Sequence, residues 1–136
     1  YQIYEAKCIG ADAVLLICSL LSAAQLGEYL AQVQELGLSA LVEAHTAGEV
    51  QQALEAGAEI IGVNNRNLKD FSVNPLNSLR LRDAIPASKI FVAESGIQCA
   101  ADTQALKQAG VQAVLVGEAL MRSADAAAML KEMRDA

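Results

Sequence analysis

Hydrophobic residues in this chain gather in short runs separated by longer segments with helical spacing. Four runs follow a glycine, in GADAVLLI, GLSALVEA, GAEIIGVN and GVQAVLVG, and a fifth, KIFVAESG, follows Pro86. Because glycine suits the left-handed position after a helix and proline cannot continue one, each run is predicted to be a strand entered from a helix. The predicted strands are Ala13–Ile17, Ala40–Ala44, Ile60–Asn64, Ile90–Glu94 and Ala113–Gly117.

The segments between these runs are predicted to be helices. One spans Ser22–Leu36, where an apolar stripe repeats at helical spacing through Leu26, Leu30, Val33 and Leu36. Thr46 and Glu49 have the spacing of a capping box, and Pro75 suits a first helical turn. The remaining predicted helices are Tyr1–Ile9, Ala100–Ala109, Ser123–Arg134 and a short one near Glu118.

Strands that alternate with helices imply parallel strands joined by right-handed crossovers. An open doubly wound sheet and a (β/α)8 barrel both fit, but the chain lacks the G-x-G-x-x-G fingerprint that favours the first. Five strands need about three more to close a barrel. We therefore expect residues 1–136 to form a single α/β domain, the C-terminal part of such a barrel. The chain opens at Tyr1 inside a helical pattern, so we expect its N-terminal strands to be missing.

Composition narrows the functional classes. The chain is 54% hydrophobic and 19% charged, which predicts a buried core rather than disorder. Its net charge is -6 without a Lys/Arg cluster, and no apolar run is long enough for a membrane span, so we expect neither nucleic acid nor a membrane as partner. Three scattered cysteines indicate reduced thiols and a cytoplasmic location. The only histidine, His45, fits no metal-site spacing, so we expect no metal and interpret it as a loop or surface residue.

Side-chain alternation along the strands places three polar residues on one face. Glu43, Asn64 and Glu94 each end an apolar run with the same parity. A single glutamate at a strand end is usually solvated, but three in register on strands about 4.8 Å apart can line one pocket. The chemistry of parallel α/β folds lies at this edge of the sheet.

Glycine turns follow the last two predicted strands, at Ser95-Gly96 and Gly117-Glu118. Glycine allows backbone N–H groups to approach an anion closely, and barrel enzymes often bind phosphate after their last two strands. Because the carboxylate of Glu118 would repel a phosphate, we assign any contact there to backbone amides.

The combination of YQIYEA, GADAVLLI, LVEAH, IIGVNNRNL, ESGI and VLVGEALM resembles the indole-3-glycerol-phosphate synthase family over essentially the whole chain. The resemblance implies that the five strands are the fourth to eighth of a barrel. It also implies a carboxy-lyase of tryptophan biosynthesis that uses no cofactor. Such an enzyme converts 1-(2-carboxyphenylamino)-1-deoxyribulose 5-phosphate, an anthranilate-derived phosphate ester, to indole-3-glycerol phosphate with loss of CO2 and water.

The resemblance also implies roles for individual residues. Glu43 matches a general base, Asn64 a residue that positions hydroxyls, and Glu94 a member of the active-site network. Substrate-binding positions are matched by Arg66, which anchors a carboxylate, by Ser95, and by the apolar residues Leu15 and Leu115. Phosphate-binding amides are matched by Gly96, Gly117 and Glu118. Asn67 stands where the family more often has Asp.

The resemblance leaves several family positions without a counterpart, above all the general-acid lysine of the third strand. We therefore expect this chain alone to be inactive, and to self-associate or to form a complex with the N-terminal part. Two alternatives remain. One is another phosphate-binding barrel such as phosphoribosylanthranilate isomerase, which Asn64-Asn65-Arg66 disfavours. The other is a non-catalytic half-barrel oligomer.

Overall fold

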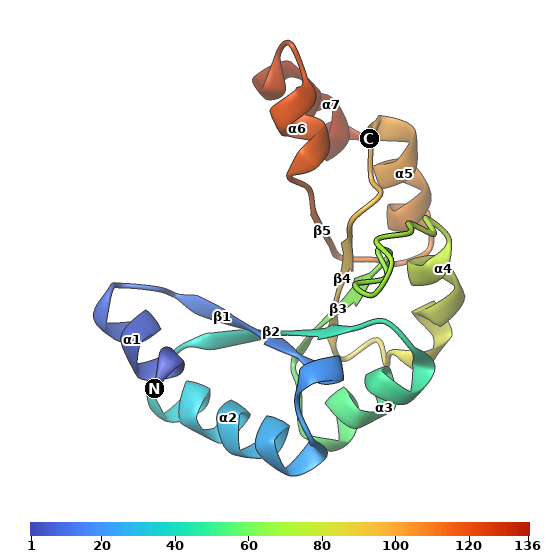
Figure 1. Ribbon diagram of the computed structural model, residues 1–136. Helices are drawn as coiled ribbons and strands as arrows, with labels where there is room; N and C mark the ends of the chain where they lie inside the picture. Colours follow the sequence, from blue (N-terminus) through green and yellow to red (C-terminus); the bar gives the residue numbers. More distant parts are fainter.

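The computed structural model describes residues 1–136 and contains one parallel five-stranded sheet in the order β1-β2-β3-β4-β5. Each strand pairs only with its sequence neighbours, so the chain winds in one direction, as in a barrel and unlike a doubly wound sheet. Figure 1 shows the curved sheet with helices on its outer side and its concave side open. The strands are β1 Ala13–Ile17, β2 Ser39–Ala44, β3 Ile60–Asn64, β4 Ile90–Glu94 and β5 Ala113–Leu115.

Helices connect the strands as the sequence pattern predicts, which confirms the α/β class. They are α1 Gln2–Cys8, α2 Ala23–Glu35, α3 Ala47–Glu55, α4 Asn77–Leu81, α5 Ala100–Gln108, α6 Glu118–Arg122 and α7 Ala126–Asp135. Two 3-10 turns, Cys18–Leu20 and Arg82–Ala84, follow β1 and α4. None of the helices has the length and apolar character needed to cross a bilayer.

Several predicted boundaries were wrong for identifiable reasons. β5 ends at Leu115 because its partner β4 ends at the paired residue, Glu94. α7 begins at Ala126 rather than Ser123, because the Asp125 side chain accepts a hydrogen bond from the N–H of Ala128 at 2.9 Å and caps the helix there.

One predicted helix start was wrong, and at a second helix the start was right but the capping interaction differs. Pro75 lies before the first turn of α4, in a turn closed by a bond from Asn77 N to Asn74 O at 3.0 Å. At α3, Thr46 caps the N–H of Glu49 as expected. The Glu49 carboxylate accepts from the N–H of His45 instead of completing the capping box.

The two faces of the sheet have different surroundings. Side chains that point toward the helices, among them Val42, Ile61, Val63 and Phe91, are fully buried in one apolar cluster. Leu26 of the predicted α2 stripe is fully buried in the same cluster. This cluster holds the helices against the sheet and fixes which side chains are left for the concave face.

The concave face retains exposed apolar side chains. Leu15, Ile90 and Leu115 point away from the helices and are 48%, 47% and 54% exposed. Parallel sheets in α/β proteins normally have both faces covered. This face therefore offers an apolar surface for further packing.

Phe91 gives a test of the helix-facing core. Its ring is fully buried, with the Arg82 guanidinium 5.8 Å from the ring centre. Phe91→Ala is expected to lower the free energy of unfolding by about 3–5 kcal/mol because it leaves a cavity. The control Gln51→Ala, on the exposed side of α3, should change it by less than about 0.5 kcal/mol. Urea unfolding followed by circular dichroism measures both, and equal shifts of the two midpoints would contradict this account of the core.

Candidate functional site at the carboxyl ends of the strands

The strand register brings the predicted polar residues to one edge and one face. Glu43 of β2 pairs with Gly62 of β3, and Asn64 of β3 pairs with Glu94 of β4. Their strand neighbours Val63 and Ala93 point into the helix-facing core, so these polar side chains point to the concave side. All three are buried, with 7%, 6% and 2% of Glu43, Asn64 and Glu94 exposed.

Glu94 lies across the backbone of β3 at Gly62. A Cβ atom at Gly62 would overlap Oε1 of Glu94 and would lie 3.1 Å from Leu41 Cδ1, so the absence of a side chain there makes room for the carboxyl group. Oε1 of Glu94 is buried and has no hydrogen-bond partner. Burial, and then the nearby charge of Glu43, raise the pKa of Glu94 to about 7. A carboxyl group with this pKa can hold or release a proton at neutral pH.

Backbone groups at the end of β3 are held by polar side chains that the sequence analysis did not select. The carbonyl oxygen of Asn64 lies 2.8 Å from Nδ1 of His45 and accepts from Nδ2 of Asn77 at 3.2 Å. The prediction that His45 is a plain loop or surface residue was therefore wrong in part. It lies in a loop, but it is half-buried and contacts the strand that carries Asn64. The Oδ1 atom of Asn64 accepts from the N–H of Arg66 at 2.9 Å and shapes the turn that follows.

Asn65 is a second residue that the sequence analysis missed. It is 1% exposed, and its Nδ2 donates to the Ser95 carbonyl at 3.0 Å. Its Oδ1 accepts from the N–H and the hydroxyl group of Ser78, at 2.9 and 2.8 Å. Ser95 has a φ of 64°, a left-handed conformation that costs a residue other than glycine about 1–2 kcal/mol. The only available signal in the sequence was the polar run after an apolar strand.

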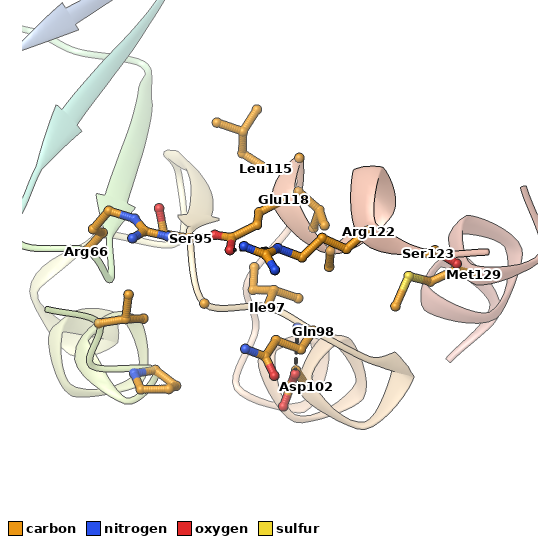
Figure 2. A pocket seen from close by; sticks show the side chains of 16 residues that line it. Arg66, Ser95, Ile97, Gln98, Asp102, Leu115, Glu118, Arg122, Ser123 and Met129 are labelled. Carbon is orange, nitrogen blue, oxygen red and sulfur yellow. Dashed lines mark hydrogen bonds and ion pairs between the residues drawn. The ribbon is translucent and has the colours of Figure 1, made fainter. Parts of the chain in front are cut away.

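A cleft of about 1000 Å³ adjoins these residues at the ends of β4 and β5 (Figure 2). It gathers six of the predicted site residues, namely Arg66, Ser95, Gly96, Leu115, Gly117 and Glu118. Glu43, Asn64 and Glu94 do not line this cleft, and Leu15 does not line it either. That residue lies at the opposite edge of the sheet, in a smaller cavity of about 320 Å³ with Leu20 and Tyr29.

The charged side chains of the cleft pair with one another. Glu118 lies between two arginines, with its carboxylate 2.9 Å from Arg66 Nη2 and 3.2 Å from Arg122 Nε. Figure 2 shows the two guanidinium groups approaching it from either side. Arg66, predicted to anchor a substrate carboxylate, thus already binds a carboxylate of the protein. Arg122 was not predicted, and the two cations leave the triad with a net positive charge.

The two glycines predicted to bind phosphate differ in what they require. Gly96 has a φ of +70°, and a Cβ there would lie 2.6 Å from Val73 Cγ1, so both conformation and space demand glycine. Gly117 has a φ of -126° and open space around its Cα. Asn67, next to Arg66, accepts from the N–H of Lys69 through Oδ1, a bond that Asp would also make.

A one-directional parallel sheet with polar groups at its carboxyl edge defines a protein of the (β/α)8-barrel class. The 3-hexulose-6-phosphate synthase from Salmonella typhimurium superposes with a TM-score of 0.80 at 18% identity, over 97% of this chain and 65% of that one. Thiamine phosphate pyrophosphorylase from Pyrococcus furiosus superposes with a TM-score of 0.76 at 19% identity, over 98% of this chain and 62% of that one. At such identities these likenesses show the fold alone.

Sequence comparison defines the family. The family model described as indole-3-glycerol phosphate synthase matches residues 1–133, and the chain belongs to this family. Indole-3-glycerol phosphate synthase of Ruminiclostridium cellulolyticum is 57% identical over 98% of this chain and 52% of its own length. The synthase of Endomicrobium trichonymphae is 56% identical over 99% of this chain and 52% of its own length. The chain thus spans about half the length of these curated relatives.

The raised pKa of Glu94 predicts a pH dependence of stability. A carboxyl group whose pKa is raised from 4.5 to about 7 favours folding below pH 4.5, and this contribution is lost as the pH rises through 7. Glu94→Gln removes the titrating group and keeps the shape. The free energy of unfolding of wild type minus that of the variant should therefore fall between pH 5 and 7, by at most about 1.4 kcal/mol per pH unit, and then level off. Urea titrations at several pH values measure this difference, and a pH-independent difference would show that Glu94 titrates normally.

Proposed function

We propose that this chain is the C-terminal, single-domain part of an indole-3-glycerol phosphate synthase. The proposed reaction converts 1-(2-carboxyphenylamino)-1-deoxyribulose 5-phosphate to indole-3-glycerol phosphate with loss of CO2 and water. The observation that carries the proposal is the buried pair Glu43 and Glu94 beside a cleft that contains cations and glycine amides. Family membership supports the same reaction, and a cytoplasmic location is part of the proposal.

The carboxyl pair supplies the proton chemistry in this proposal. Ring closure and dehydration require a base and an acid held out of water. Glu43 acts as the general base, and Glu94, whose pKa is about 7, shares the network in which protons are exchanged. Asn64, on the same face, positions the hydroxyl groups of the substrate. No metal or organic cofactor takes part.

The cleft binds the anionic groups of the substrate. Backbone amides near Gly96 and Gly117, with the hydroxyl group of Ser95, hold the phosphate. Arg66 binds the substrate carboxylate, which must replace Glu118 as its partner. Leu115 lines this cleft and Leu15 the far edge of the concave face, so the aromatic ring of the substrate lies between opposite sides of a completed barrel.

This chain lacks a lysine that reaches the concave face. Lys89 precedes β4 and pairs with Glu59 at 2.7 Å, and Lys69 lies in the loop after β3. The other three, Lys7, Lys107 and Lys131, lie on helices. Loss of one acid–base group typically lowers a rate by 10²–10⁴-fold, so the 136-residue chain without a partner is inactive in this proposal.

Complementation tests the proposal. The 136-residue chain is mixed with a polypeptide that contains the first half of the Ruminiclostridium cellulolyticum relative, and formation of indole-3-glycerol phosphate is followed by fluorescence. The mixture is expected to turn over, whereas either part alone is not. Glu43→Gln should reduce the gain by about 10²–10⁴-fold, and the control Gln51→Ala should not affect it. Full activity of the Glu43→Gln mixture would remove Glu43 from the catalytic role.

Exposed apolar residues on the concave face support a second candidate, a non-catalytic half-barrel that self-associates. Leu15, Ile90 and Leu115 are each about half exposed, and unpaired strand edges invite pairing with another chain. Sedimentation distinguishes the two candidates. A stable homo-oligomer that the complementing polypeptide cannot dissociate favours the second, and formation of a one-to-one complex favours the synthase.

A further inference from the structure

We propose that Asn65 is a positioning residue that aims the backbone N–H of Gly96 into the cleft, where it receives the phosphate of the substrate. The inference deepens the proposed function and rests on it for the identity of the substrate. Asn65 was not among the predicted site residues, and it does not line the cleft.

Asn65 ties four segments together. Its N–H donates to the Glu94 carbonyl at 2.8 Å, and its own carbonyl accepts from the N–H of Asn74 at 2.8 Å. The side chain joins Ser78 of α4 to the carbonyl of Ser95 after β4. Every polar atom of this residue therefore has a partner, at 1% exposure.

The bond to Ser95 has a consequence for the next amide. The carbonyl of Ser95 and the N–H of Gly96 belong to one peptide unit, which is planar and trans, so the two bonds point in opposite directions. Nδ2 of Asn65 donates to this carbonyl, and Asn65 is buried and does not line the cleft, so we infer that the carbonyl points into the protein. The N–H of Gly96 then faces the cleft, which this glycine lines, and it has no hydrogen-bond partner within the chain.

The backbone conformation at Ser95 and Gly96 needs a hydrogen bond to hold it. Ser95 and Gly96 are consecutive residues with φ of 64° and 70°. Successive left-handed residues are uncommon when one carries a side chain. The Ser95 carbonyl accepts no other hydrogen bond within the chain, so loss of the Asn65 donor frees the peptide unit to rotate.

Two variants separate positioning from stability. Asn65→Asp keeps the size of the side chain and the acceptor for Ser78, but it replaces the donor with an oxygen that faces the Ser95 carbonyl. Ser78→Ala removes bonds from the same network, to Asn65 Oδ1 and the Val63 carbonyl, and leaves the bond from Asn65 to Ser95 intact. Both changes cost stability, but only the first should disturb the Gly96 amide.

The measurement is titration of inorganic phosphate into the protein expressed from its complete gene, followed by 15N–1H NMR at the Gly96 amide. At pH 8, Asn65→Asp is expected to raise the Kd for phosphate by about ten-fold or more, and Ser78→Ala by less than about three-fold. In the enzyme assay, Asn65→Asp should raise KM more than it lowers kcat, and Ser78→Ala should change KM by less than Asn65→Asp does. As the pH falls, the introduced carboxyl group gains a proton that it can donate to Ser95, so the ratio of variant to wild-type Kd should shrink.

A Kd for Asn65→Asp within two-fold of wild type, or equal effects of the two variants, would overturn the proposal. A measurement on the wild type covers the case in which Asn65→Asp does not fold. Phosphate should shift the Gly96 amide and the side-chain NH2 signal of Asn65 together, and a shift of neither, or of Gly96 alone, contradicts it. If the variants change the phosphate Kd as expected but the protein does not turn over the substrate, this inference holds and the proposed function is wrong. If the protein turns over the substrate but Asn65→Asp leaves KM unchanged, the proposed function holds and this inference is wrong.

Discussion

The register between β2, β3 and β4 is the constraint on which the rest of the site depends. It sets Glu43 beside Gly62 and Asn64 beside Glu94, all on the face that the helices do not cover. A shift of one residue would turn each polar side chain into the apolar layer and the apolar ones out of it. Burial of Val63, Phe91 and their neighbours against the helices therefore fixes where the carboxyl groups lie.

At Glu94, the arrangement that serves the proposed chemistry lowers the stability of the fold. The apolar layer favours the fold strongly, while Glu94 is held in a place where its charged form is disfavoured and one oxygen lacks a partner. A substrate that donates a hydrogen bond to that oxygen would relieve part of this penalty. The side chains of Asn65, Asn77 and Ser78 have hydrogen-bond partners by contrast, and they give the turns around the cleft a defined shape.

The sequence predicted what depends on periodicity and missed what depends on side chains that meet through space. Apolar runs that follow a glycine or Pro86 predicted the five strands, and side-chain alternation predicted the shared face of Glu43, Asn64 and Glu94. The end of β5 was wrong, because an edge strand stops where its single partner stops. The pairing of Arg66 with Glu118 joins residues 52 positions apart, and no local pattern indicates it. The same holds for the contact of His45 with the Asn64 carbonyl.

The missing side chain of Gly62 has a consequence for recombination between barrels. The Glu94 carboxyl group occupies the space that any other residue at 62 would fill. The acid and the vacancy lie on different strands, so they can be inherited or exchanged separately. A chimera that replaces β3 with a strand carrying alanine at position 62 would keep every polar residue of the site. It would nevertheless displace the carboxyl group of Glu94, whose pKa is about 7. Compatibility between barrel segments therefore depends here on an empty position as much as on the residues that carry the chemistry.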